Sequence, residues 1–164
     1  MSYVIQGIDP APFRHLYGLT DRELARHGAI RMIADAKPGY PCRVTLKDVD
    51  PGSAVLLVNH EHLPVGTPYR SCHAIFVAEG AEQLARYEAA IPDQLRGRLL
   101  SVRAFDADGM MIDAEVLEGT SLEAEIERMF ADPRVAYLHV HNARPGCFAA
   151  RVDRARSQPA GLQL

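Results

Sequence analysis

Two His-x-His pairs are the residues of this sequence whose types and spacing best suit metal chemistry: His60 with His62, and His139 with His141. Residues two apart in a β-strand point to the same face, so each pair could hold one metal ion. Two such pairs on neighbouring strands would form a four-nitrogen site for zinc, iron or another imidazole-binding metal. No Cys-x-x-Cys motif accompanies them, so we predict that folding requires no tightly bound metal.

A second set of polar side chains lies at expected strand ends, beside proline or glycine. Guanidinium groups pair with carboxylate or phosphate in a bidentate fork, and imidazole and amide groups add further hydrogen bonds. We therefore expect segments 40–43, 69–73 and 139–147 to meet in one concave site for a small acidic ligand. Its candidate ligand-binding residues are Arg43, Tyr69, Arg70, His73, His139, His141 and Asn142.

Cys42, Cys72 and Cys147 are the candidates for thiol chemistry. Their odd number and wide spacing predict unpaired, reduced thiols. His73 follows Cys72 directly, and adjacent strand residues face opposite sides, so it is poorly placed to act as the base for that thiol.

The loop before Cys147 decides which groups that thiol can meet. A four-residue loop at 143–146 places Cys147 opposite Asn142, on the other face from His139 and His141. A bulge at the end of this loop would reverse that arrangement.

Helices and strands alternate irregularly along the chain. Two capping boxes, Thr20 with Glu23 and Thr120 with Glu123, predict helix starts, and apolar residues at helical spacing predict a third helix. The expected helices are at about 20–27, 80–91 and 120–132. The expected strands are at 31–36, 43–46, 54–59, 73–77, 99–105, 110–117, 135–142 and 147–153. This pattern predicts an α+β fold with a mainly antiparallel, strongly curved or barrel-like sheet of about eight strands and about three helices.

The segment 99–117 is the clearest expected hairpin. A three-residue loop at 107–109, with Gly109 left-handed, separates one apolar face from one polar face. In that register Arg103 lies near Asp113 as a cross-strand ion-pair partner.

Length and composition predict one domain at 1–153 and a loose tail at 154–164 in this chain of 164 residues. The net charge of −3 argues against a nucleic-acid partner. No apolar run approaches the roughly 20 residues that span a bilayer, and no secretory signal is visible. We therefore expect a cytoplasmic protein with no membrane partner.

Four segments of the sequence stand out together: Pro38-Gly-Tyr-Pro-Cys-Arg43, Pro68-Tyr-Arg-Ser-Cys-His-Ala-Ile-Phe-Val77, Arg103-Ala-Phe-Asp106 and His139-Val-His-Asn-Ala-Arg-Pro-Gly-Cys147. In these segments the sequence resembles an uncharacterised family, domain of unknown function 1203. The resemblance runs from about residue 21 to residue 154, and the last segment is the most specific. It implies a small, single-domain, mostly bacterial type of protein, and it implies no catalytic role for any residue.

Three function hypotheses remain open. The first is a site that binds or acts on a small acidic molecule, and the second is a non-enzymatic interaction domain that forms a homodimer. The third is a thiol-based sensor or enzyme. No phosphate-binding glycine motif and no nucleophile elbow is present, and no cofactor is clearly implied.

Overall fold

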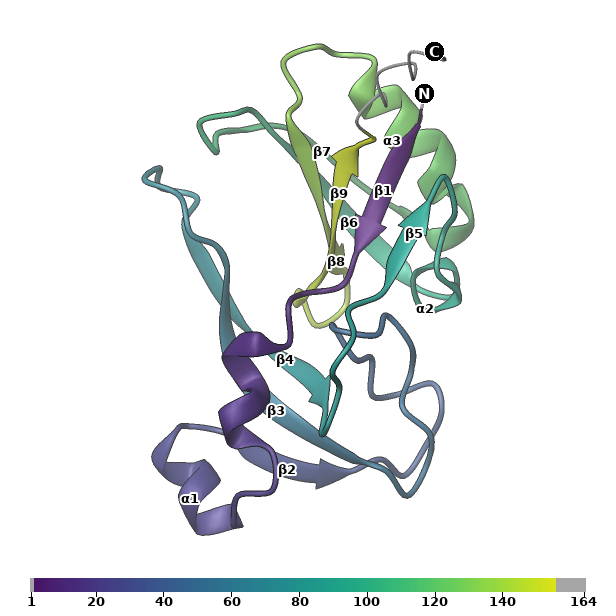
Figure 1. The fold of residues 1–164 in the computed structure, drawn as a ribbon. Helices are drawn as coiled ribbons and strands as arrows, with labels where there is room; N and C mark the ends of the chain where they lie inside the picture. The colour runs from purple at the N-terminus through teal and green to yellow at the C-terminus, as the bar shows by residue number, and fades with distance from the viewer. Residues whose placement is uncertain (1, 156–164) are drawn as a thin grey trace, which may run out of the picture.

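The computed structural model describes residues 2–155, which form two open antiparallel sheets, one above the other in Figure 1. In spatial order, the larger sheet contains β5 (Arg86–Glu88), β1 (Tyr3–Gln6), β9 (Phe148–Arg154), β8 (Tyr137–Asn142), β6 (Leu99–Phe105) and β7 (Met111–Glu118). The smaller sheet contains β2 (Ile30–Ile33), β3 (Ala54–Leu63) and β4 (Ser71–Ala78). The expected α+β fold with mainly antiparallel pairing is confirmed. The described residues form nine strands in two separate sheets, and these sheets do not close into a barrel.

Short helices cover each sheet. The α-helices are α1 (Asp21–Arg26), α2 (Asp93–Arg96) and α3 (Leu122–Phe130), and the 3-10 helices are η1 (Ala11–Leu16) and η2 (Gly119–Ser121). The α1 helix begins at the expected capping box, in which Thr20 and Glu23 satisfy each other's backbone amides. No helix in the described range 2–155 is long and apolar enough to cross a membrane.

Each sheet has its own hydrophobic core. The larger sheet packs one face against α3, whose buried stripe is the one that the helical spacing predicts. The smaller sheet packs against η1 and α1 through a second core that includes Phe13 and Leu24. The opposite face of the larger sheet is therefore left for the smaller sheet to cover.

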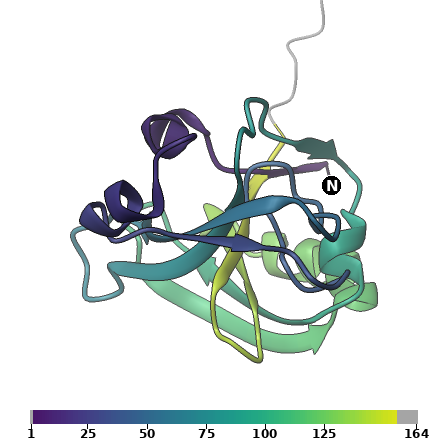
Figure 2. The ribbon, with the colours of Figure 1, turned by 90° about the horizontal axis from the view of Figure 1, so that it is seen from below.

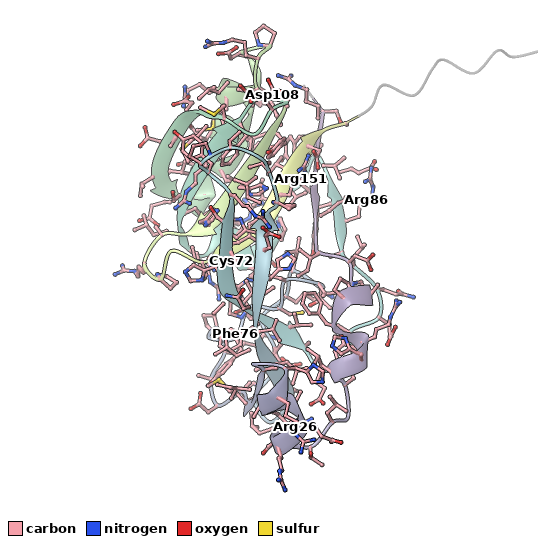
Figure 3. The ribbon with its side chains drawn as sticks, turned by 90° about the vertical axis from the view of Figure 1, so that its left-hand side faces the viewer. Arg26, Cys72, Phe76, Arg86, Asp108 and Arg151 are labelled. Carbon is pink, nitrogen blue, oxygen red and sulfur yellow. The ribbon has the colours of Figure 1, made fainter. Side chains whose placement is uncertain are left out.

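The β3–β4 hairpin joins the two sheets. Leu63, at the end of β3, packs with Phe105 and Tyr137 of the larger sheet. Seen from below, the smaller sheet crosses the strands of the larger one (Figure 2). In the side view, Cys72 of β4 lies between the two ends of the molecule, which Asp108 and Arg26 mark (Figure 3).

The expected strand at 43–46 is a turn. Cys42 makes an isolated bridge to Phe76 of β4, and the Arg43 amide donates to the Phe76 carbonyl at 3.0 Å. Leu46 then adopts a φ of 51°, a left-handed conformation that ends the extended run. The apolar sequence is buried as expected, but it leaves the sheet after a single bridge.

The expected helix at 80–91 is also wrong. Residues 86–88 form β5, which pairs with β1, and Ala89 has a φ of 47° that no helix contains. Of the three apolar residues at helical spacing, Tyr87 and Ile91 pack against the larger core from non-helical segments, whereas Leu84 is 40% exposed. Pairing with the exposed edge of β1 outweighs the local pattern.

The hairpin of β6 and β7 has the expected loop but not the expected register. The loop at 107–109 closes as predicted, and Gly109 is left-handed with a φ of 86°. A bulge beyond the loop shifts the pairing by one residue, so Arg103 faces Ala114 and Asp113 lies on the other face. The prediction that Arg103 pairs with Asp113 is therefore wrong.

Two smaller expectations concern segment ends. The α3 helix begins after the η2 turn, and its N-cap Ser121 makes no side-chain capping bond, so the second capping box is absent. Arg154 belongs to β9 rather than to a tail. The remainder of the expected loose tail, 156–164, lies outside the described residues.

Candidate functional site

Arg43 is a deeply buried arginine, with 1% of its surface exposed. Its Nε donates to Phe148 O at 2.8 Å, Nη1 to Pro41 O at 2.5 Å and Nη2 to Cys147 Sγ at 2.9 Å. No carboxylate in the described chain forms an ion pair with it. Burial lowers the pKa of this guanidinium.

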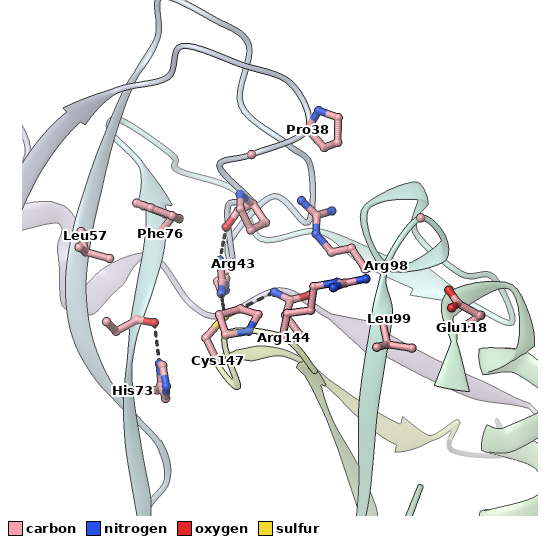
Figure 4. A pocket seen from close by; sticks show the side chains of 16 residues that line it. Pro38, Arg43, Leu57, His73, Phe76, Arg98, Leu99, Glu118, Arg144 and Cys147 are labelled. Atoms are coloured by element: carbon pink, nitrogen blue, oxygen red, sulfur yellow. Dashed lines mark hydrogen bonds between the residues drawn. The ribbon is translucent and has the colours of Figure 1, made fainter. Parts of the chain in front are cut away.

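Arg43 lines a cavity of about 670 Å³, which we call the inter-sheet cavity (Figure 4). The smaller sheet forms one wall, and the 143–146 loop with the start of β6 forms another. Polar and apolar side chains both line this cavity, among them Leu57, His73, Phe76, Arg98, Glu118, Asn142, Arg144 and Cys147. Of the two other arginines, Arg98 is paired with Asp48 at 2.5 Å, whereas Arg144 is exposed.

Asn142 and Cys147 face each other across the 143–146 loop. The backbone N–H of Asn142 donates to Cys147 O at 2.9 Å, and the side-chain Nδ2 of Asn142 donates to Cys147 Sγ at 3.5 Å. Asn142 Oδ1 is buried with no hydrogen-bond partner. The four-residue loop and the separation of Cys147 from the His139 and His141 face are confirmed.

A histidine cluster formed by His62, His139 and His141 lies between the two sheets. His62 comes from β3, and the other two come from the face of β8 that α3 does not cover. The ring centroid of His62 is 5.6 Å from that of His139 and 5.0 Å from that of His141. His139 and His141 are 1% and 2% exposed, so the cluster is an interior feature.

Burial is the main cause of the low pKa values in this cluster. It lowers the pKa of His62 to about 4, that of His139 to about 2 and that of His141 to about 3. Neighbouring positive groups, Arg103 among them, lower these pKa values further. The three imidazoles are therefore neutral near pH 7.

Arg103 and Phe148 belong to this site, although the sequence did not indicate them. Arg103 shares a face of the larger sheet with His139, its direct partner on β8. Phe148 stacks on His62 at 5.0 Å and meets His139 edge-on at 4.9 Å. The position of Phe148 two residues after Gly146, opposite the second His-x-His pair, was the only available signal.

Three candidate residues belong neither to the inter-sheet cavity nor to the histidine cluster: Tyr69, Arg70 and His60. Tyr69 is 37% exposed and touches Phe105, and the exposed Arg70 pairs with Glu61. His60 meets Phe13 edge-on at 5.7 Å, because the pairing of β3 with β4 shifts just after it. The four-nitrogen arrangement is thus wrong: three histidines converge, and the fourth does not.

Three of the seven candidate ligand-binding residues line the inter-sheet cavity. It brings Arg43, His73 and Asn142 together, with His73 Nδ1 held 3.0 Å from Ala74 O. His139 and His141 lie in the histidine cluster instead.

All three cysteines are free, as expected. Cys42 and Cys147 are buried, and Cys72 is exposed. Cys42 Sγ accepts hydrogen bonds from the Ala78 amide at 3.2 Å and the Thr45 amide at 3.5 Å. These contacts make Cys42 a structural side chain beneath the turn that carries Arg43.

The two open sheets, the inter-sheet cavity and the buried histidine cluster define an α+β protein with polar side chains gathered between its sheets. The chain belongs to the family described as protein of unknown function DUF1203, whose model matches residues 39–154. That range contains Arg43, Cys147 and the whole histidine cluster. Neither the curated proteins nor the solved structures contain a match to this chain.

Proposed function

We propose that this protein binds a small carboxylate-bearing molecule in the inter-sheet cavity. The observation that carries the proposal is Arg43, a buried cation with no carboxylate partner among residues 2–155. Burying an unpaired charge costs several kcal/mol, and an anion beside the guanidinium offsets that cost. Three of its N–H groups already bond to the protein, which leaves two of the five for a ligand.

Other side chains of the cavity support a ligand that also carries a hydroxyl or amino group. The unsatisfied Asn142 Oδ1 accepts hydrogen bonds and so suits such a donor. Arg144 adds a second positive charge, which Glu118 opposes in part. Leu57 and Phe76 add apolar walls, and the volume of about 670 Å³ lies within the usual range for small-molecule sites.

Thermal unfolding with a panel of anions tests this proposal. Acetate, succinate, malate and inorganic phosphate are added separately, and calorimetry measures the melting temperature. Malate, which carries both carboxylates and a hydroxyl, should stabilise most. A concentration of ten times Kd adds about 1.4 kcal/mol, which corresponds to roughly 3–6 °C for a domain of this size.

Two matched arginine variants provide the specificity control. Arg144→Gln removes an exposed charge at the cavity and should weaken binding without affecting the fold. Arg26→Gln removes an exposed charge at the far end of the molecule (Figure 3) and should change nothing. The proposal fails if no anion stabilises the wild type, or if the two variants respond alike.

A thiol function is a second candidate, and one contact favours it. Cys147 Sγ accepts hydrogen bonds from both Arg43 and Asn142, and it lines the inter-sheet cavity. A Cys147→Ser variant separates the two candidates, because anion binding should survive it and thiol chemistry should not. The homodimer hypothesis stays a prediction that sedimentation of the purified protein would test.

A further inference from the structure

Three imidazole rings from two different sheets converge at one point. Each of His62, His139 and His141 offers a nitrogen, and these nitrogens all lie within 4.8 Å of one another. The histidines of β8 are two residues apart and share a face, while His62 arrives from β3 across the sheet interface. This three-point arrangement therefore depends on how the sheets pack.

Each of the three rings has a buried nitrogen without a hydrogen-bond partner. These atoms are His62 Nδ1, His139 Nδ1 and His141 Nε2. Buried polar groups are almost always satisfied, and leaving one unsatisfied is costly. Three such atoms in one cluster point to one shared partner.

The orientation of His141 is set by a backbone contact. Its Nδ1 lies 3.0 Å from Gly146 O, and a carbonyl can only accept, so Nδ1 carries the proton. The lone pair is then on Nε2, the atom without a partner. A metal-ligating histidine commonly has its second nitrogen held in this way by a backbone carbonyl.

The surroundings of the cluster restrict the kind of metal. The aromatic rings of Phe148 and Phe105 enclose His139 at 4.9 and 5.4 Å, and the cluster contains no carboxylate or thiol. A set of neutral imidazoles suits zinc, copper, nickel, cobalt or iron, and it does not suit calcium or magnesium.

We propose that His62, His139 and His141 bind one divalent first-row transition-metal ion, with zinc as the reference ion. Zinc–nitrogen bonds of about 2.0–2.1 Å at tetrahedral angles separate the nitrogens by about 3.3 Å. The rings therefore move together by up to about 1.5 Å from their present spacing when the metal binds. This inference uses residues other than those of the inter-sheet cavity, so it stands apart from the proposed ligand.

Three protein ligands leave a fourth coordination position open. A cavity of about 280 Å³ adjoins His62 and His139 and contains Asp9 and Arg151 at its walls. Catalytic zinc sites typically have this arrangement of three protein ligands with one exchangeable position. Arg103 lies on the same sheet face as His139, and its positive charge repels a divalent metal ion bound by the cluster. The fourth ligand should therefore be an anion.

Metal titration of untagged protein tests the site directly. Chelator-stripped protein is titrated with Zn²⁺ in competition with a chromophoric chelator, and with Co²⁺ while its visible absorption is recorded. We expect one equivalent to bind, with at least a hundredfold loss of affinity in His62→Ala and in His141→Ala. His27→Ala, which removes an exposed histidine outside the cluster, is the matched control and should bind like the wild type.

Two further measurements keep the proposal falsifiable if a histidine variant folds poorly. Arg103→Gln should bind Zn²⁺ several-fold more tightly, because it removes a like charge. Azide should alter the Co²⁺ spectrum by entering the open position. The proposal is overturned if the wild type binds no tighter than folded His62→Ala, or if Arg103→Gln weakens binding. An unchanged spectrum with azide overturns the open position.

Discussion

Replacing Arg43 by lysine keeps its charge and removes its planar fork. The guanidinium now contacts Phe148 O, Pro41 O and Cys147 Sγ in three directions. A single ammonium cannot reach all three, so about two of these contacts are lost. Each hydrogen bond to a charged group contributes about 1.5–3 kcal/mol, so Arg43→Lys should destabilise the fold by about 3 kcal/mol or more.

Urea unfolding followed by circular dichroism measures this effect. We expect a lower midpoint with an unchanged slope, and a melting temperature lower by roughly 6–12 °C. Arg144→Lys makes the same substitution at an exposed position of the same cavity and should stay within about 0.5 kcal/mol of the wild type. A loss below about 1 kcal/mol in Arg43→Lys would refute the argument that its three contacts hold the 43–46 turn against β9.

Three further predictions follow from single contacts. Gly7→Ala should cost about 3 kcal/mol or more in urea unfolding, because the new Cβ would lie 1.9 Å from a backbone carbonyl oxygen, whereas Gly66→Ala meets nothing within 4 Å and should be neutral. Burial raises the pKa of the Tyr3 hydroxyl to about 12, above its usual 10. The neutral tyrosine therefore contributes stability below pH 10, and this contribution is lost as the pH rises toward 12. Urea unfolding curves that do not change between pH 10 and 12 would contradict this prediction. Iodoacetamide should label exposed Cys72 in the native protein and buried Cys42 only after unfolding, as mass spectrometry of the peptides would show.

Local patterns predicted those elements whose stability depends on near neighbours. The capping box at Thr20 begins α1, and the apolar stripe of α3 faces the core, because both signals act within a few residues. The β8–β9 loop was likewise predictable, since loop length decides which residues face each other.

The errors occur where distant segments compete for the same residues. Segment 80–91 carries a helical pattern, yet β1 offers an edge that residues 86–88 complete. The β6–β7 register was wrong by one residue because a bulge in β7, which no local signal revealed, turned Asp113 to the face opposite Arg103.

The sequence by itself determined that His139 and His141 share a face, because side chains alternate along any strand. It left two arrangements of Asn142 and Cys147 open, and the structure shows that they meet across a four-residue loop. Only the tertiary structure decided that His62, from the other sheet, completes the histidine cluster while His60 does not. The burial of Arg43 against Phe148 was also decided only by the tertiary structure. The Arg43–Phe148 contact joins residues 105 positions apart, and His62 lies more than 70 positions before the other two histidines. Both contacts depend on how the two sheets pack, which no local pattern encodes.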